Sequence, residues 1–225
     1  MEERNKRPNF YIVAIVILIL IIAAFAYNQW GKKFLPELKG KSGDKFSKIN
    51  VNITDEDIQI GNKNAKIAII EYYSYACSFC KSFHDSIYPL IVEDYITKGK
   101  AKFIFRPFPP YELGQAVLCA NEQAKFLEYH TYLFDNIDNL KNVDGLKIFA
   151  RDSGLNESEF KECYDSGKYK KRAEEWYNQG MSDMTKAKIS QDQRGTPAFF
   201  INGEPILGAQ PYEKFIEVIE SKLTE

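Results

Sequence analysis

Two cysteines separated by two residues, Cys77-Ser78-Phe79-Cys80, are the part of this chain best suited to chemistry. The run before them, residues 66–73, is almost continuously apolar, as in a strand buried on both faces. Apolar residues at helical spacing follow them. The start of a helix favours negative charge, and the thiolate is the form of cysteine that attacks disulfides. The motif therefore predicts thiol–disulfide exchange.

Two other interpretations of this spacing stay open. Two of the four cysteines can lie three positions apart by chance, or the pair can be half of a zinc site with His84 as a third ligand. The second histidine, His130, and the remaining cysteines, Cys119 and Cys163, form no further CxxC or HxxxH motif that would complete four ligands. We therefore expect no metal here.

The N-terminus indicates where the protein works. Residues 10–27 are apolar and uncharged, follow a basic flank at 1–9, and as a helix would span about 27 Å, close to the hydrocarbon core of a bilayer. This pattern predicts a transmembrane anchor or a signal segment. Cleavage after Ala26 is one alternative, but the stretch is longer than a usual cleaved signal, so we favour an anchor. Either way, the rest of the chain is exported.

Export changes the interpretation of the two single cysteines. Disulfides form and persist outside the cytoplasm. Cys119 and Cys163 each lie in a helical pattern, and we expect a structural disulfide between them. Two buried free thiols are the alternative, because the sequence does not show whether the geometry permits a bond.

The exported part divides into a tether and one domain. Residues 28–56 are rich in lysine and have little periodicity, which is typical of a tether beside a membrane. Residues 57–225 are long enough for one domain with a full core. The net charge is −1 and no basic block lies outside the tether, so we expect no nucleic-acid partner.

Strand and helix patterns within the domain indicate its class. Strand patterns lie at 66–73, 101–106 and 198–201, the last of which turns through Asn202-Gly203 into a strand at 205–207. Helical patterns lie at 113–136, 145–153, 157–164, 168–188 and 212–223. Most of these helices separate the second strand from the third. The order predicts an α/β sandwich that carries an inserted all-helical subdomain.

Four features together resemble the DsbA-type thiol:disulfide oxidoreductases, which have a thioredoxin-like fold. They are the strand, CxxC and helix at 71–83, Gly195-Thr196-Pro197 before a strand, the hairpin that follows, and the helical insertion. The resemblance covers the domain. It implies a thioredoxin-like first half with the CxxC motif at 57–111, a helical insertion at 112–192, and a second half with a cis-proline loop at 193–225.

The resemblance also implies roles for individual residues. Cys77 would be the exposed nucleophile and Cys80 the resolving cysteine. Pro197 would be cis and would hold the backbone of Thr196 open for an extended substrate. Glu71 would be a buried acid that helps proton transfer at the resolving cysteine. An exposed glutamate on an edge strand is the alternative for that position.

The function implied by the resemblance is that of an extracytoplasmic oxidase, in the periplasm or on the outer face of the membrane. It would donate the Cys77–Cys80 disulfide to unfolded or newly exported cysteine-containing proteins, would be recharged by a membrane redox partner, and would need no cofactor beyond that disulfide. Ser78-Phe79 lacks the proline or histidine common in strongly oxidising members. A reductase or isomerase, or a metal-binding CxxC module, is therefore the alternative. For His84, two helical turns beyond Cys77, we expect a packing or surface position.

Overall fold

The structure, a computed structural model, describes residues 46–225, which form one unit. The basic flank predicted at 1–9 and the anchor or signal segment predicted at 10–27 lie outside the described residues. Within residues 46–225, no helix combines the length and the apolar character that a membrane span requires.

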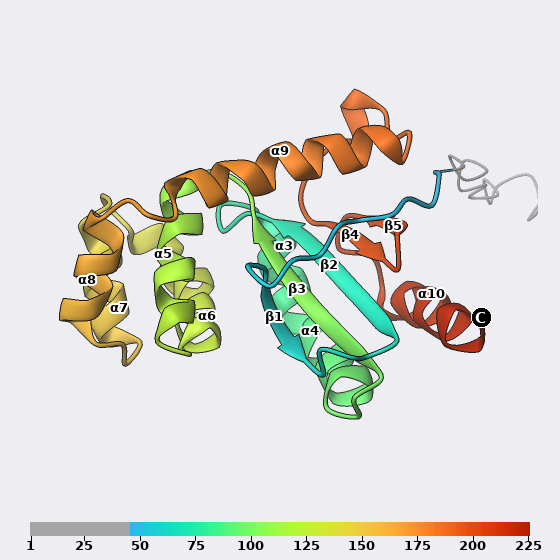
Figure 1. Cartoon of the computed structure of the whole chain (residues 1–225), viewed down its shortest axis with the longest axis horizontal. Helices are drawn as coiled ribbons and strands as arrows, with labels where there is room; N and C mark the ends of the chain where they lie inside the picture. The colour runs from blue at the N-terminus through green and yellow to red at the C-terminus, as the bar shows by residue number, and fades with distance from the viewer. Residues whose placement is uncertain (1–45) are drawn as a thin grey trace, which may run out of the picture. The chain divides into compact units, whose positions relative to one another are not determined.

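A five-stranded sheet in the order β1-β3-β2-β4-β5 forms the centre of this unit (Figure 1). The two central strands, β2 (Ile67–Tyr73) and β3 (Ala101–Pro107), run parallel, and every other neighbouring pair is antiparallel. These strands and the hairpin of β4 (Ala198–Ile201) and β5 (Glu204–Leu207) lie where the sequence predicts them. The thioredoxin-like α/β class is confirmed.

The edge strand β1 (Ile58–Gly61) was not predicted. It pairs with β3, from Ile58 opposite Phe105 to Gly61 opposite Lys102. Four residues that end in glycine give too short an alternation to be recognised as a strand.

Two short helices and the last helix cover one face of the sheet. They are α3 (Ser78–Ser86), α4 (Tyr88–Ile91), which continues into the π-helical turn η2 (Val92–Ile96), and α10 (Tyr212–Thr224). Their aromatic side chains meet one another and those of the sheet: the ring of Phe83 on α3 lies 4.5 Å from that of Phe199 on β4 and 5.4 Å from that of Phe215 on α10. Burial of such rings stabilises the docking of α3, which carries the CxxC motif.

The long helix α9 (Lys170–Lys186) lies over the opposite face (Figure 1). A second buried cluster fills the space below it; its members include Ile70, Tyr72, Ile104, Phe200, Met184 and Ala187. The α/β sandwich therefore has two cores, one on each side of the sheet.

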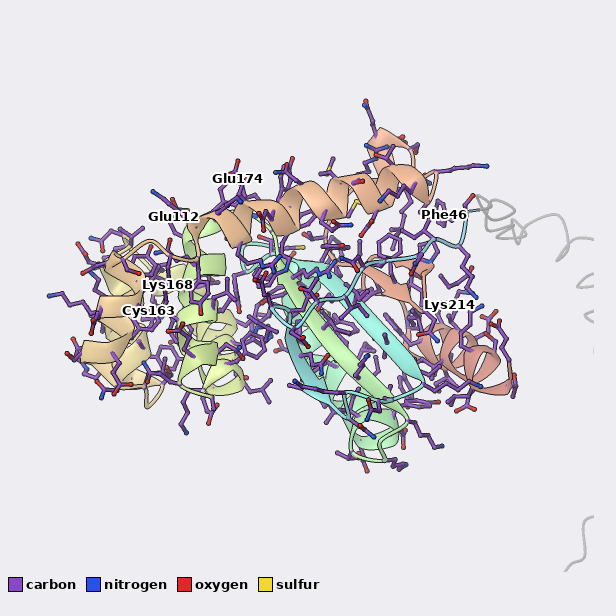
Figure 2. All side chains as sticks on the ribbon, viewed as in Figure 1. Phe46, Glu112, Cys163, Lys168, Glu174 and Lys214 are labelled. Atoms are coloured by element: carbon purple, nitrogen blue, oxygen red, sulfur yellow. A yellow bond between two sulfur atoms is a disulfide. The ribbon has the colours of Figure 1, made fainter. Side chains whose placement is uncertain are left out.

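Part of the predicted tether, residues 28–56, belongs to this second core. Phe46, the first described residue, lies beside the C-terminal end of α9 (Figure 2). The N–H of Ser47 donates to the carbonyl of Ala187 at 2.9 Å, and the N–H of Ile49 donates to Gly203 at 3.0 Å. Val51 is buried. The stretch 46–56 thus packs on the domain, because its apolar residues Phe46, Ile49, Val51 and Ile53, set among polar ones, belong to the second core.

Four helices form the insertion between β3 and α9, and they lie together beside the sheet (Figure 1): α5 (Tyr111–Glu122), α6 (Phe126–Asn136), α7 (Gly145–Asp152) and α8 (Glu157–Asp165). The helix predicted over 113–136 is two helices, since Ala124 takes a positive φ of 54° that ends α5. Asn156, followed three residues later by Glu159 as is typical of a helix start, caps α8: its side chain accepts from the N–H groups of Ser158 and Glu159. Single 3-10 turns, η3 (Ile137–Asn139) and η4 (Gln191–Gln193), complete the structure.

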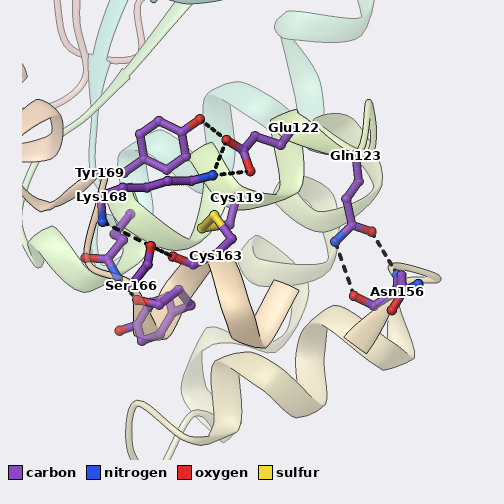
Figure 3. Close-up of a disulfide and its surroundings, with 10 residues drawn as sticks. Cys119, Glu122, Gln123, Asn156, Cys163, Ser166, Lys168 and Tyr169 are labelled. Atoms are coloured by element: carbon purple, nitrogen blue, oxygen red, sulfur yellow. Dashed lines mark hydrogen bonds and ion pairs between the residues drawn. A yellow bond between two sulfur atoms is a disulfide. The ribbon is translucent and has the colours of Figure 1, made fainter. Parts of the chain in front are cut away.

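A disulfide joins Cys119 of α5 to Cys163 of α8 (Figure 3). Close to it, Lys168 donates to Glu122 at 2.8 Å, and the hydroxyl of Tyr169 donates to the same carboxylate. Helix α8 is therefore held to α5 by a covalent bond, and the segment after α8 by hydrogen bonds to the charged Glu122.

Removal of this disulfide tests its contribution to stability. We expect the double variant Cys119→Ala/Cys163→Ala to lose roughly 2–4 kcal/mol of unfolding free energy, because the bond closes a loop of 44 residues in the unfolded chain. Urea unfolding of the oxidised protein and of the variant measures the difference. An unchanged unfolding midpoint would show that the helical insertion is held by packing alone.

Candidate active site

The CxxC motif lies at the junction between β2 and α3. Cys77 is the N-cap residue of α3 and has an extended backbone, with φ −100° and ψ 115°. Its side chain is partly exposed, whereas Cys80, in the first turn, is fully buried; both are free thiols. One turn of helix thus gives the two sulfur atoms different environments.

The environment of Cys77 favours its thiolate. Partial burial raises the pKa of this thiol, but hydrogen bonds from the side chain of Thr196 and from the backbone N–H groups of Cys80 and Phe79 lower it, and the net pKa lies below the ordinary value. In the protonated form, the Sγ atom donates to the carbonyl of Thr196 at 3.1 Å. Of the two thiols, Cys77 is therefore the one whose environment favours the reactive thiolate form.

The loop before β4 brings Thr196 and Pro197 to this cysteine. The peptide bond between them is cis. Because β4 pairs with β2, with Ala198 opposite Tyr72, the loop lies beside the end of β2. The carbonyl of Pro197 accepts from the N–H of Gly208 at 2.8 Å, which fixes the loop from the β5 side.

The environment of Cys80 favours its thiol. Burial and the charge of Glu71 raise its pKa far above the ordinary value, and the N–H of Ser74, 3.5 Å from the Sγ atom, offsets this only in part. The hydroxyl of Ser74 donates to the carbonyl of Pro109 at 3.0 Å, next to the start of α5. A proton must therefore leave Cys80 before its sulfur can attack a disulfide.

Glu71 is a buried acid, not an exposed glutamate of an edge strand. It lies on the central strand β2, and no part of it is exposed. Its Oε2 atom is 2.9 Å from Nε2 of His84, and its Oε1 atom is buried with no hydrogen-bond partner within the described part of the chain. Burial raises the pKa of this carboxyl, and His84 lowers it in part.

A chain of polar side chains continues from this carboxyl. Nδ1 of His84 lies 3.4 Å from Nε2 of His130, whose Nδ1 lies 2.6 Å from the hydroxyl of Tyr75. That hydroxyl is 3.1 Å from the hydroxyl of Tyr73. Sequence reasoning missed this chain. The available signal was the spacing of His84 from Cys80: residues four apart share one face of a helix.

Two further features concern the metal-binding alternative and the exposed surface of the CxxC motif. Across residues 46–225, no group of three or more His, Cys, Asp and Glu side chains is placed to hold a metal ion, and Nε2 of His84 faces Glu71. Phe79 is 67% exposed within the CxxC motif, which leaves an aromatic ring open to a bound peptide.

The comparisons with known proteins agree with this geometry. Residues 53–221 match the sequence model of the thioredoxin family. A Rickettsia typhi protein named as a protein-disulfide oxidoreductase is 24% identical over 70% of this chain, which spans 58% of that relative's length. The disulfide bond formation protein D of Bacillus subtilis is 26% identical over 73% of this chain and 76% of its own.

Solved structures give the same assignment. The chain superposes on Wolbachia pipientis alpha-DsbA1 with a TM-score of 0.64 and 26% identity, covering 76% of this chain and 93% of that one. Oxidised BdbD of Bacillus subtilis gives a TM-score of 0.65 at 22% identity, covering 81% and 100%, and supports the fold. The chain belongs to the thioredoxin family and, within it, to the DsbA-type proteins.

Proposed function

We propose that this protein is an extracytoplasmic thiol:disulfide oxidase whose Cys77–Cys80 disulfide is passed to exported proteins. The contrast between the two cysteines carries the proposal: a partly exposed thiol of lowered pKa lies one helical turn from a fully buried thiol of raised pKa. This is the arrangement that thiol–disulfide exchange requires.

In the oxidising direction, a substrate thiolate attacks Sγ of Cys77 in the disulfide, and Cys80 leaves as a thiolate that takes up a proton. A second substrate thiolate then attacks the substrate sulfur of the mixed disulfide and releases Cys77. The substrate loses two electrons and two protons and gains a disulfide, and the enzyme becomes a dithiol.

Recharging reverses these steps. Cys77 attacks the disulfide of an oxidising partner, and Cys80 then loses its proton and displaces the partner from Cys77. Glu71 is the base that we assign to this deprotonation, since it is buried and electrostatically coupled to Cys80. The redox group is the cysteine pair itself, and no further cofactor enters these steps.

Thr196 and Pro197 are the residues to which we assign substrate positioning. Their loop borders Cys77, and proline offers no N–H to compete for a partner strand. An extended segment that carries the reacting cysteine would lie along this loop, with Phe79 beside it.

Location and partners follow from the same proposal. The anchor predicted at 10–27 would place the domain outside the cytoplasm, where newly exported cysteine-containing proteins are its substrates and a membrane redox partner recharges it. The name of the Bacillus subtilis relative, a disulfide bond formation protein, supports the oxidising direction. A reductase or isomerase is the second candidate, because Ser78-Phe79 lacks a proline or histidine.

The reduction potential of the Cys77–Cys80 pair tests the direction. We expect a value well above the roughly −270 mV of thioredoxin, towards the roughly −120 mV of strong oxidants, because the Cys77 thiolate stabilises the reduced form. Equilibration with glutathione buffers, with the Cys119–Cys163 bond intact, gives this value. A potential at or below that of thioredoxin would favour the reductase.

Substrate trapping tests the assignment of the two cysteines. We expect Cys80→Ser to accumulate mixed disulfides with its substrates, because the resolving thiol is absent while Cys77 still reacts. The matched variant Cys77→Ser should form none. Non-reducing electrophoresis of the tagged full chain from its native compartment detects the adducts, and equal adducts in both variants would contradict the assignment.

The hydroxyl of Thr196 allows a test of thiolate stabilisation. Thr196→Val keeps the shape of the side chain but removes a hydrogen bond that lowers the pKa of Cys77, so that pKa should rise. Thiolate absorbance at 240 nm, followed against pH, measures it in the reduced protein. An unchanged titration would mean that the backbone N–H groups alone stabilise the thiolate.

A further inference from the structure

The hydrogen bonds of the chain that ends at Glu71 can run toward the carboxylate or away from it. Only one of these two directions gives every buried hydrogen an acceptor. Burial raises the pKa of Tyr73 and Tyr75, so both keep their hydroxyl hydrogens, and burial lowers the pKa of His130, which therefore carries a single ring hydrogen. The hydroxyl of Tyr75 has two neighbouring acceptors, Nδ1 of His130 at 2.6 Å and the oxygen of Tyr73 at 3.1 Å. Nδ1 of His130 also lies 3.3 Å from the hydroxyl of Tyr73. Whether this nitrogen accepts a hydrogen bond or carries the ring hydrogen therefore determines every later bond.

If Tyr75 donates to Nδ1 of His130, each hydrogen finds an acceptor. His130 then carries its hydrogen on Nε2 and donates to Nδ1 of His84, which in turn donates from Nε2 to Oε2 of Glu71. Tyr73 donates to the oxygen of Tyr75. All four bonds point toward the carboxylate.

The opposite direction is costly. His130 would carry its hydrogen on Nδ1 and donate to Tyr75, and the hydroxyl of Tyr75 would donate to Tyr73. Nδ1 of His130, 3.3 Å from the hydroxyl of Tyr73, could then no longer accept, so the hydrogen of Tyr73 would have no acceptor within the described part of the chain. His84 would turn an unprotonated Nε2 toward the carboxylate of Glu71. A buried donor without an acceptor and two lone pairs facing each other both raise the free energy of that arrangement.

We propose that His130 and Tyr75 are positioning residues: through His84 they fix a donor on Oε2 of Glu71, so that Oε1 alone remains to accept the proton of Cys80. This inference rests on the proposed function, in which Glu71 is the base for the resolving cysteine. The buried and unpartnered Oε1 is the second observation that supports it.

The proton balance of the step is simple. The thiol of Cys80 gives its proton to Oε1 of Glu71, and the resulting thiolate attacks Sγ of Cys77 in the mixed disulfide. The Cys77–Cys80 bond forms, the bond from Cys77 to the partner sulfur breaks, and the partner leaves as a thiolate. The histidines keep their hydrogens throughout, because their function is to orient the carboxylate.

The other titratable groups that face this chain do not supply an alternative donor to Oε2. The side chain of Tyr88 on α4 packs its ring 5.1 Å from that of His84, with the pKa of its hydroxyl raised by burial. Phe105 on β3 and Phe134 on α6 complete the surroundings of His84 and carry no hydrogen-bonding groups. His84 is thus the one side chain that donates to Glu71 within the described residues.

The resolving step can be followed alone in the full chain. Reduced protein is mixed with oxidised glutathione, Cys77 forms the mixed disulfide, and the later release of the second glutathione reports the attack by Cys80. We expect His130→Phe to slow this release roughly fivefold or more at neutral pH, because His84 loses the partner that fixes its tautomer. With a weaker donor on Oε2, the pKa of Glu71 rises further, so the pH of half-maximal rate should rise as well.

Tyr75→Phe should shift the pH profile in the same direction but by less, because the hydroxyl of Tyr73, 3.3 Å from Nδ1 of His130, remains as a donor. Tyr129→Phe is the matched control: Tyr129 is buried on α6 next to His130, but its hydroxyl donates to the carbonyl of Leu146, outside the chain. The control should leave the profile unchanged. The thiolate titration of Cys77 should be the same in all three variants, which separates a local effect from a loss of structure.

The outcomes distinguish this inference from the function on which it rests. If Glu71→Gln slows the release but His130→Phe and Tyr75→Phe give the profile of the Tyr129→Phe control, the positioning role is wrong and the oxidoreductase assignment stands. If Glu71→Gln itself leaves the release unchanged, Glu71 is not the base, and both the base assignment and the positioning role fail.

Discussion

The alternation of side chains along β2 is the constraint on which the rest of this structure depends. Ile70 and Tyr72 point to the face under α9, whereas Glu71 and Tyr73 point to the face that α3 covers. One strand therefore supplies two buried polar networks on opposite sides of the sheet. A register slip of one residue would exchange them, placing Glu71 on the face under α9.

The network on the α9 side shows why the register holds. Arg106 donates to both carboxylate oxygens of Asp57, at 2.9 and 2.7 Å, and to the hydroxyl of Tyr72 at 2.9 Å. Trp176 donates to Asp57 at 3.0 Å, and Tyr72 donates to Asp183 at 2.6 Å. Buried charges that lose a partner are costly, so α9 and three segments of the sheet layer are held in one arrangement.

The sequence predicts local elements here better than it predicts contacts between them. The strands, the CxxC junction and the Asn156 cap follow from short-range patterns, whereas β1 is too short to give one and the break at Ala124 lacks a glycine. The pairing of Glu71 with His84 depends on how α3 packs on β2, and His130 comes from the distant helix α6. No sequence periodicity reports such packing.

The way in which the chain enters the domain has a mechanical consequence. The segment from Phe46 to Val51 lies against α9 and the β4–β5 hairpin, held by the hydrogen bonds of Ser47 to Ala187 and of Ile49 to Gly203. A side chain at Gly203 would collide with the carbonyl of Ile49, so this contact depends on a glycine. Force applied to the chain at Phe46 would therefore act on these hydrogen bonds before it reached β2 and the CxxC junction.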